Sequence, residues 1–295
     1  MLNALSIDVE DYWSILARDW LHIDAEPSGA VERNTKWFLD TLAEHSVKAT
    51  FFILGEVAEK FPALVAQISK DGHEIGVHGF YHRQIFKITE QEFAHEVGDA
   101  KKLLEDIASV SVLGHRAPAF SVNSTTQWAL EVLAREGFEY DSSISPMAGK
   151  RYGWPGFHKG IHRMQLPSGR SIIEVPMSTV TLLGKELVVG GGYIRHFPYA
   201  FTKWAIKYIQ RRKPVIIYMH PYEIDTEHKP FSTEHLSQKD ETRVIRFHKM
   251  QLRNRKSMPY KVHSLLSQFK FTTISEVISR TLVERHSTRS TTEEL

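Results

Sequence analysis

Short β-rich stretches alternate with longer amphipathic stretches along most of this chain. A buried strand followed by an amphipathic helix is the repeating unit of parallel sheets and barrels, because the helix returns the chain to the start of the next strand. The alternation therefore predicts an α/β fold with a parallel sheet or barrel. The first strands are expected at 2–9, 49–54 and 74–77, and the first helices at 31–45 and 56–70.

The pattern continues after these elements with one interruption. Thr89 and Glu92 have the spacing of a capping box, which predicts a helix start. Residues 145–170 are rich in Gly, Pro and aromatic residues, and we expect a long loop there over one end of the sheet or barrel. We predict one domain over residues 1–284 and a polar, disordered tail at 285–295. Further strands are expected at 111–114, 138–141, 171–175 and 214–220, and further helices at 124–136 and from 198 to about 212.

Charge and cysteine content narrow the classes of function. Among the 295 residues, 37 Lys and Arg oppose 35 Asp and Glu, a net charge of +2 that is too balanced for a nucleic-acid-binding field. Cysteine is absent, so any metal must be held by nitrogen and oxygen ligands. The first residues show no basic and apolar leader pattern, and no apolar run approaches the ~20 residues of a membrane span. We expect a cytoplasmic protein.

Two acids share one face of the first predicted strand. Asp8 and Glu10 lie two residues apart, so their side chains project together, whereas Asp11 projects to the other face. Two carboxylates in a low-dielectric site repel unless a cation or proton compensates them. A position in solvent beyond the strand end is the plainer interpretation of such a pair taken alone.

Two histidines follow the third predicted strand. His78 and His82 are separated by three residues, a spacing that lets two imidazoles converge on one cation. Such a pair is often incidental in a histidine-rich chain. His73, beside a glycine in a turn, is more consistent with a structural role.

Three further polar residues end predicted strands. Arg116 follows the strand at 111–114, Asp141 closes the next one, and His220 ends the apolar run from 214. Each has an ordinary structural explanation: a salt bridge, a turn or cap, and a core histidine bonded to a carbonyl. In a parallel barrel, however, the carboxyl ends of the strands meet at the face that carries the chemistry. We therefore predict that these residues and the acid pair share one site.

The order of these motifs resembles the polysaccharide deacetylase family, also called the NodB homology family. The acid pair, H-x-x-x-H, Arg116-Ala117-Pro118, Asp141 and His220 match it in order. The segments from Ser6 to Trp13, from Gly190 to Arg195 and from His220 to Asp225 resemble the subfamily of exopolysaccharide biosynthesis loci. The resemblance implies a distorted (β/α) barrel with about seven parallel strands.

The resemblance also implies roles for individual residues. It makes Asp8 the general base and Glu10, His78 and His82 the ligands of one divalent metal, most simply Zn²⁺, with Co²⁺, Ni²⁺ or Fe²⁺ as substitutes. The common family motif has adjacent aspartates, so the D-x-E of this chain leaves Asp11 as an alternative ligand to Glu10.

In the mechanism that we expect, the metal, Arg116 and His220 divide the work of hydrolysis. Arg116 holds Asp8, a backbone N–H from 117–120 meets the oxyanion, and His220, oriented by Asp141, protonates the leaving amine. Candidate substrate contacts are Trp154, Tyr193, Arg195 and Tyr222.

These features predict a metal-dependent hydrolase that removes the acetyl group from an N-acetylated sugar in a polysaccharide or glycan precursor. Fold alone does not fix the substrate. Two alternatives remain: an allantoinase- or imidase-like enzyme acting on a non-carbohydrate amide or imide, and an inactive carbohydrate-binding barrel. The sequence does not indicate the oligomeric state.

Overall fold

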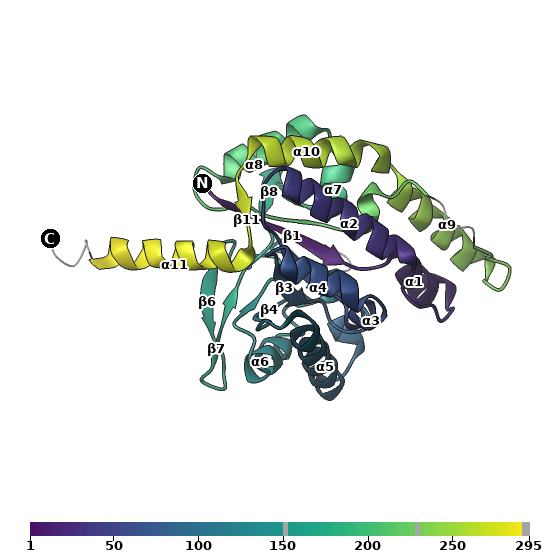
Figure 1. The fold of residues 1–295 in the computed structure, drawn as a ribbon, viewed down its shortest axis with the longest axis horizontal. Coiled ribbons are helices and arrows are strands. Elements are labelled where there is room, and N and C mark those ends of the chain that lie inside the picture. Colours follow the sequence, from purple (N-terminus) through teal and green to yellow (C-terminus); the bar gives the residue numbers. More distant parts are fainter. Residues whose placement is uncertain (150–152, 228–230, 291–295) are drawn as a thin grey trace.

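A curled, mostly parallel sheet forms the centre of the computed structural model, which describes residues 1–149, 153–227 and 231–290 (Figure 1). The strand order is β10-β1-β2-β3-β4-β5-β7-β6, and β11 also pairs with β1. Pairing is parallel from β10 to β7, and β6 at the far edge runs antiparallel to β7. The bounds are β1 Asn3–Val9, β2 Thr50–Ile53, β3 Glu74–Val77, β4 Gly114–His115, β5 Tyr140–Asp141, β6 His162–Gln165, β7 Ser171–Glu174, β10 Ile216–Met219 and β11 Phe271–Thr272.

The predicted α/β fold of the distorted-barrel type is confirmed, although the sheet is an open half-barrel: within the described ranges β10 and β6 end it without pairing to each other. Strands β1, β2 and β10 are buried along their whole length, as expected for parallel strands covered on both faces. Leu5, Ile7 and Val9 of β1 face the helices outside, whereas Ala4 joins the apolar cluster inside the curl.

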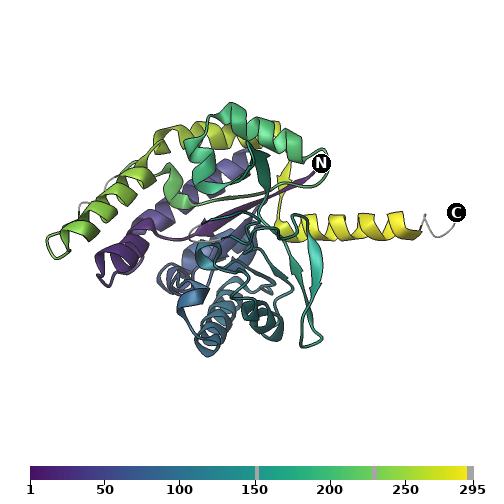
Figure 2. The same ribbon diagram turned by 180° about the vertical axis from the view of Figure 1, so that it is seen from behind.

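Helices pack on the outer surface of the sheet. In Figure 2 the blue helices α3–α6 lie below the sheet and the green helices α8–α10 above it. The bounds are α1 Tyr12–Leu16, α2 Gly29–Glu44, α3 Gly55–Lys60, α4 Pro62–Lys70, α5 Glu90–Ala108, α6 Trp128–Arg135, α7 Gly191–His196, α8 Tyr199–Ile209, α9 Gln238–Leu252, α10 Met258–Gln268 and α11 Ile274–Ser290. Short helical turns are η1 Ala17–Leu21, η2 Ile85–Lys87, η3 Pro118–Phe120, η4 Pro221–Ile224 and η5 Arg255–Ser257.

Helix starts follow local chemistry. The predicted capping box is present, because Thr89 Oγ1 accepts from Glu92 N–H and the Glu92 carboxylate accepts from Thr89 N–H. The single helix expected at 56–70 is two helices, α3 and α4. Pro62 disfavours a helical conformation at Phe61, whose φ and ψ are −128° and 56°.

The loop expected at 145–170 is shorter than predicted. It ends at β6, which forms a hairpin with β7, and residues 150–152 lie outside the described residues. A second hairpin, β8 Thr179–Leu182 with β9 Lys185–Val188, has no counterpart among our predictions.

Helix α11 projects away from the body of the molecule (Figure 1). Its first turn is anchored, because Ile274 is buried inside the curl and its N–H donates to Thr50 Oγ1. The helix runs to Ser290, past the boundary predicted at 284, and residues 291–295 lie outside the described residues.

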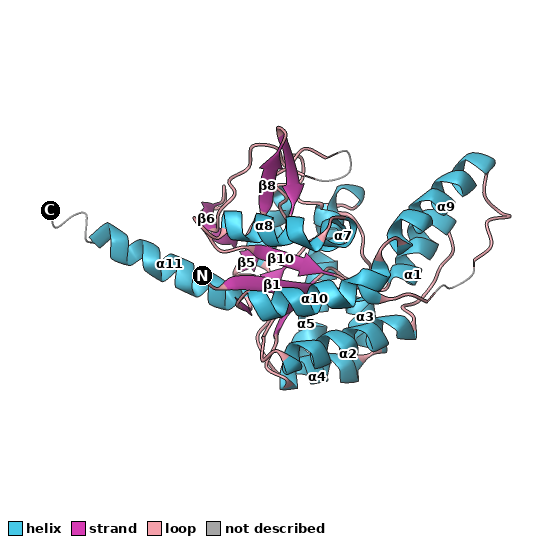
Figure 3. Ribbon diagram, turned by 90° about the horizontal axis from the view of Figure 1, so that it is seen from above, coloured by secondary structure: helices cyan, strands magenta, loops and turns pink. Residues whose placement is uncertain are grey.

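A small apolar cluster covers the end of the sheet to which the strands point. Leu16, Leu21 and Val244 are buried there, and half-buried aromatic rings such as Trp20 and Phe247 pack around them. This cluster joins α1 and η1 to α9. In Figure 3 the arrowheads of β1 and β10 point toward these helices. The cluster therefore builds one wall above the carboxyl ends of the strands.

Candidate active site

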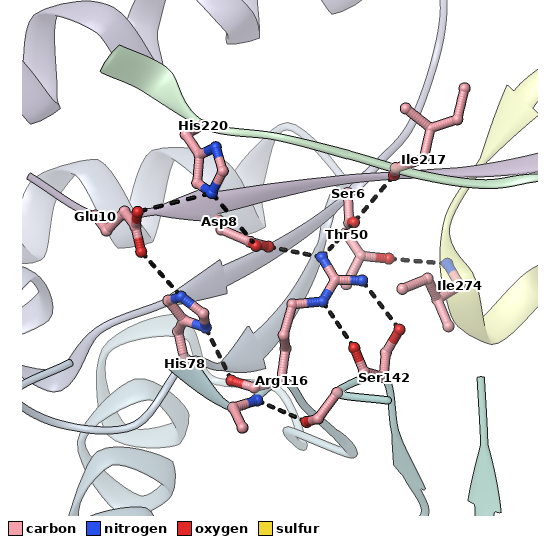
Figure 4. A network of polar contacts seen from close by, with 12 residues as sticks. Ser6, Asp8, Glu10, Thr50, His78, Arg116, Ser142, Ile217, His220 and Ile274 are labelled. Atoms are coloured by element: carbon pink, nitrogen blue, oxygen red, sulfur yellow. Dashed lines mark hydrogen bonds and ion pairs between the residues drawn. The ribbon is translucent and has the colours of Figure 1, made fainter. Parts of the chain in front are cut away.

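The predicted strand-end residues converge on one cleft. Asp8 and Glu10 come from the end of β1, His78 from the loop after β3, and His220 from the end of β10 (Figure 4). His82 follows in the same loop as His78. All five line a cleft of about 670 Å³. Arg116, directly after β4, lies beneath them and is completely buried.

Glu10 and the two histidines form a compact set of possible metal ligands. Glu10 Oε2 is 3.1 Å from His78 Nε2 and 2.9 Å from His82 Nε2. His78 Nδ1 lies 2.8 Å from the carbonyl oxygen of Arg116. Because a carbonyl only accepts, this bond places the proton on Nδ1 and leaves the Nε2 lone pair directed at Glu10.

The negative charge of Glu10 favours the binding of a cation at this cluster. Burial raises the pKa of Glu10, but His82, His220 and His78 outweigh it and hold the pKa well below its usual range. An ionised carboxylate facing an imidazole lone pair is unfavourable unless a proton or a metal ion lies between them. One carboxylate and two imidazoles also match the ligand types of catalytic zinc sites. These residues therefore fit a divalent metal.

The local backbone explains how His78 and His82 meet. Gly79 has φ of +80°, and His82 itself has φ of +57°, a left-handed conformation that is uncommon outside glycine. Phe80 packs against Gly55, where a Cβ atom would come within 2.5 Å of its ring. The turn is thereby held tightly against α3, and both imidazoles reach the same carboxylate.

Asp11 is not part of the metal-ligand cluster. Its carboxylate caps α1 by accepting from Ser14 N–H at 3.0 Å, and it also accepts from Ser28 N–H and Oγ at 3.0 and 2.8 Å. The alternation along β1, which turns Asp11 away from Glu10, accounts for this. The geometry therefore favours Glu10 over Asp11 as ligand.

Arg116 contacts Asp8, as predicted. Its Nη1 donates to Asp8 Oδ1 and to Ser6 Oγ, both at 2.6 Å, and the Nε and Nη2 atoms donate to the Ser142 carbonyl and hydroxyl, both at 3.0 Å (Figure 4). The guanidinium also lies over the Phe52 ring at 4.3 Å. Because Arg116 holds Asp8 Oδ1, the other carboxylate oxygen, Oδ2, faces the cleft and lies 4.0 Å from His220 Nε2.

The predicted contact between Asp141 and His220 is wrong. Asp141 Oδ1 accepts from His115 Nδ1 at 2.7 Å and from Ser143 Oγ at 2.6 Å, and all three side chains are fully buried. The reason is the strand order: β5 lies between β4 and β7, whereas His220 leaves β10 beside β1. Asp141 therefore supports the Arg116 loop and does not contact the His220 ring.

Glu223 is the carboxylate behind His220. Its Oε1 is 3.7 Å from His220 Nδ1, and the imidazole stacks on Tyr222 with ring centres 4.8 Å apart. Burial lowers the pKa of His220, but Glu10, Glu223 and Asp8 together raise it to about 9. The signal in the sequence was the H-P-Y-E spacing, in which Pro221 starts a helical turn and Glu223 folds back on His220.

The predicted substrate contacts need correction. Tyr222 lines the cleft, but Arg195 is buried and donates to the carbonyls of Met250 and Arg253 at 3.2 and 3.1 Å and to that of Gln251. It lies behind Glu223, with Nε 3.8 Å from Oε1, so it supports the site from outside the cleft.

Trp154 and Tyr193 also lie away from the cleft lining. Trp154 packs on Phe157 with ring centres 4.7 Å apart, and the Tyr193 hydroxyl contacts Met147 Sδ at 3.9 Å. Other aromatic residues that we did not predict border the cleft instead. They are Tyr12, Trp20, Phe86, Phe120, Tyr218 and Phe247.

Fold and cleft together define the class of protein. The polysaccharide deacetylase family model matches residues 20–140, and a model described as a domain of unknown function (DUF3473) matches residues 142–279. The resemblance to polysaccharide deacetylases of the NodB type is thereby confirmed. His78, His82 and Arg116 lie in the first matched segment, and His220 and Glu223 in the second.

Individual relatives agree with the family match. The chain is 38% identical over 98 residues to a peptidoglycan-N-acetylglucosamine deacetylase of Bacillus cereus, covering 33% of this chain and 36% of that protein. It is 38% identical over 80 residues to a chitooligosaccharide deacetylase of Azorhizobium caulinodans, covering 27% and 38%. The chain thus spans little more than a third of either relative.

A solved structure supports the fold. A Mycobacterium smegmatis protein classed with the polysaccharide deacetylases superposes with a TM-score of 0.59 at 16% identity, covering 96% of this chain and 91% of that one. In the described part of this chain, none of the helices is long and apolar enough to cross a bilayer.

Proposed function

We propose that this protein is a metal-dependent N-deacetylase that hydrolyses the acetamido group of an N-acetylated sugar. The observation that carries the proposal is the placement of Glu10, His78 and His82 beside an Arg116-held Asp8 and a cationic His220 in one cleft. These are the groups that amide hydrolysis by an activated water requires. The deacetylase names of the partial relatives agree with it.

Glu10, His78 and His82 would hold the metal, and zinc suits this set of ligands best. When bound, such a cation acidifies water and polarises the acetyl carbonyl. His78 is oriented for this role by the Arg116 carbonyl, so the loop after β4 supports both the ligands and the base.

Asp8 is the proposed general base. The Arg116 guanidinium holds one of its oxygens and keeps the carboxylate in a fixed orientation, while Oδ2 is left to take the proton of the attacking water. The two residues are 2% exposed or less, so water competes little for the salt bridge.

His220 is the proposed general acid. Its raised pKa means that the ring is cationic at neutral pH, ready to give the Nε2 proton to the leaving nitrogen. Amide cleavage needs this proton because an unprotonated amine is a poor leaving group. Glu223 Oε1 lies 3.7 Å from Nδ1 on the far side of the ring, and its negative charge favours the cationic imidazole.

For the oxyanion, Ala119 N–H is the proposed donor. Within 117–120, Ala117 N–H donates to Ser143 Oγ at 2.7 Å, Pro118 has no N–H, and Phe120 N–H donates to the Ala117 carbonyl. Ala119 lines the cleft and has a left-handed backbone with φ of 52°.

The shape of the cleft favours an extended substrate. A second hollow of about 890 Å³ shares Asp19, His82, Gln84 and Lys87 with the cleft, so open space continues past the metal ligands. A glycan with sugars on both sides of the reacting residue fits such a groove better than a small cyclic imide.

Acetate release tests the proposal directly. Purified protein loaded with zinc is expected to release acetate from N-acetylglucosamine oligomers, to stop after chelator treatment, and to recover when zinc is restored. Ring opening of hydantoin or a cyclic imide without acetate release would instead indicate an allantoinase- or imidase-like enzyme. If protein that retains metal catalyses neither reaction, the result would favour an inactive carbohydrate-binding barrel.

A Glu223→Gln variant is expected to shift the alkaline limb of kcat/KM to lower pH. His220 must be protonated to act as acid, so activity falls as pH rises through its pKa of about 9. Removing the Glu223 charge lowers that pKa by roughly one to two units. Glu227→Gln, which changes an exposed carboxylate paired with Arg33, is the matched control. An alkaline limb that is unchanged by Glu223→Gln would contradict the assigned partnership.

A Trp20→Ala variant is expected to raise KM roughly three- to tenfold with little change in kcat. Trp20 stacks on Phe247 at 4.3 Å along the cleft wall, where it offers an apolar face to a sugar. Trp154→Ala, at a tryptophan that packs on Phe157, is the comparison and is expected to leave KM unchanged. Equal effects of the two substitutions on KM would remove Trp20 from the substrate site.

A further inference from the structure

Two parts of the chain carry many cations and no acid. Residues 187–222 and 242–275 contain no Asp or Glu, although the chain as a whole has nearly equal numbers of both signs. The structure packs the two stretches together. The Tyr199 hydroxyl of α8 donates to the Ser264 carbonyl of α10 at 2.9 Å, and Lys261 Nζ donates to the Ile194 and Phe197 carbonyls at 2.8 Å. The two acid-free stretches therefore lie against each other.

The outer surface of α8 combines these cations with exposed aromatic rings. Trp204 is 44% and Tyr208 49% exposed, and their rings stack with centres 5.7 Å apart. Lys203, Lys207 and Arg211 flank them around a shallow hollow. We call these five residues the basic aromatic face. Tyr260 of α10, 68% exposed, lies beside the start of the same helix, 6.2 Å from Tyr199.

The cations of this face are not neutralised nearby. Within the described ranges, Lys203, Lys207 and Arg211 form no ion pair. Glu186, on the neighbouring hairpin β8–β9, is already paired with Lys159 at 2.7 Å. The positive charge is thus available to an outside partner.

We propose that the basic aromatic face docks the protein on an anionic lipid bilayer. Trp and Tyr rings favour the headgroup region of a membrane, and the long stems of Lys and Arg let their charges reach anionic headgroups while the rings insert. The face runs along α8 and continues past its end to Arg211, so its charges and rings can meet a planar surface together. A second copy of the same face would be repelled by its own charge.

The face is separate from the cleft. None of its residues lines the cleft. Helix α8 lies on the outer surface of the sheet (Figure 1), whereas the catalytic residues of the cleft follow the carboxyl ends of the strands. Docking would therefore leave the catalytic groups free, and it can be tested without the deacetylase substrate.

Co-sedimentation with vesicles tests the proposal. The full chain is expected to bind vesicles of phosphatidylcholine mixed with phosphatidylglycerol, to bind pure phosphatidylcholine weakly, and to be released by salt. A Lys203→Gln, Lys207→Gln, Arg211→Gln variant is expected to lose roughly fivefold in affinity per charge. A Trp204→Ser, Tyr208→Ser variant is expected to lose binding while the cations remain.

A matched control separates the effect of the charge on this face from the effect of the net charge of the protein. Lys36→Gln, Lys70→Gln, Lys102→Gln removes the same charge from exposed positions on α2, α4 and α5, and it is expected to bind as the original protein does. Circular dichroism of all variants checks folding. Equal binding by the face and control variants, or no binding to anionic vesicles, would overturn the proposal. The proposal would also be overturned if the protein bound no vesicles but formed a dimer in sedimentation velocity, and if Trp204→Ser dissociated that dimer.

Discussion

A His78→Ala variant is expected to lose its bound zinc and its acetate release together. His78 is 2% exposed, its Nε2 faces Glu10 at 3.1 Å, and its other ring nitrogen is fixed by the Arg116 carbonyl. Alanine removes one of the three proposed ligands and leaves the Glu10 carboxylate buried with less compensation. The loss of zinc affinity should exceed the roughly 10- to 100-fold drop that follows loss of an outer-shell partner.

Metal analysis of the purified variant and a zinc titration of its activity measure this effect. His95→Ala is the matched control, because His95 lies exposed on α5 and pairs with Asp99 across one helical turn. That variant should keep both zinc and activity. A His78→Ala protein with a full zinc complement would remove His78 from the ligand set and with it the core of the proposed function.

An Asp8→Asn variant is expected to keep zinc but lose roughly 10²- to 10⁴-fold in kcat, the range that a general base contributes. Asparagine has the same shape as aspartate and its carbonyl still accepts from Arg116, yet it cannot take a proton from water. Metal content should be unchanged because Asp8 lies outside the Glu10, His78 and His82 cluster. This separation of kcat from metal content distinguishes a base from a ligand.

The same substitution also removes the partner of a fully buried cation. Leaving Arg116 without its counter-charge should lower the free energy of unfolding by about 3 kcal/mol, so stability and kcat must be measured separately. Asp225→Asn is the control, since it breaks a pair with the half-exposed Arg33. A variant that retains most of its kcat would show that Asp8 is not the base.

The sequence was sufficient to predict the residues at the strand ends. Strand β10 is an apolar run that stops at His220, β1 carries Asp8 and leads into Glu10, and parallel strands bring such ends to one edge. For that reason Asp8, Glu10 and His220 could be predicted to meet. The contact of Arg116 with Asp8 followed from the same reasoning.

Contacts that depend on how the elements pack in three dimensions could not be predicted from the strand ends. The strand order places β5 beside β4, so Asp141 meets His115 and not His220. Glu223 meets His220 through the helical turn that begins at Pro221, a local contact that the H-P-Y-E spacing could have indicated. Trp20 becomes a cleft residue because α9 packs over η1, a contact between segments more than two hundred positions apart.

The position of β1 has a consequence for biosynthesis. This first strand pairs with β2 on one side and with β10 on the other, where Ala4 lies opposite Ile216. On the ribosome, β1 has no second neighbour until β10 has been made, and its unpaired edge is unprotected during that time. Nascent chains that stop before β10 should therefore depend on chaperones, since the acid pair and its histidine come together only after β10 has been synthesised.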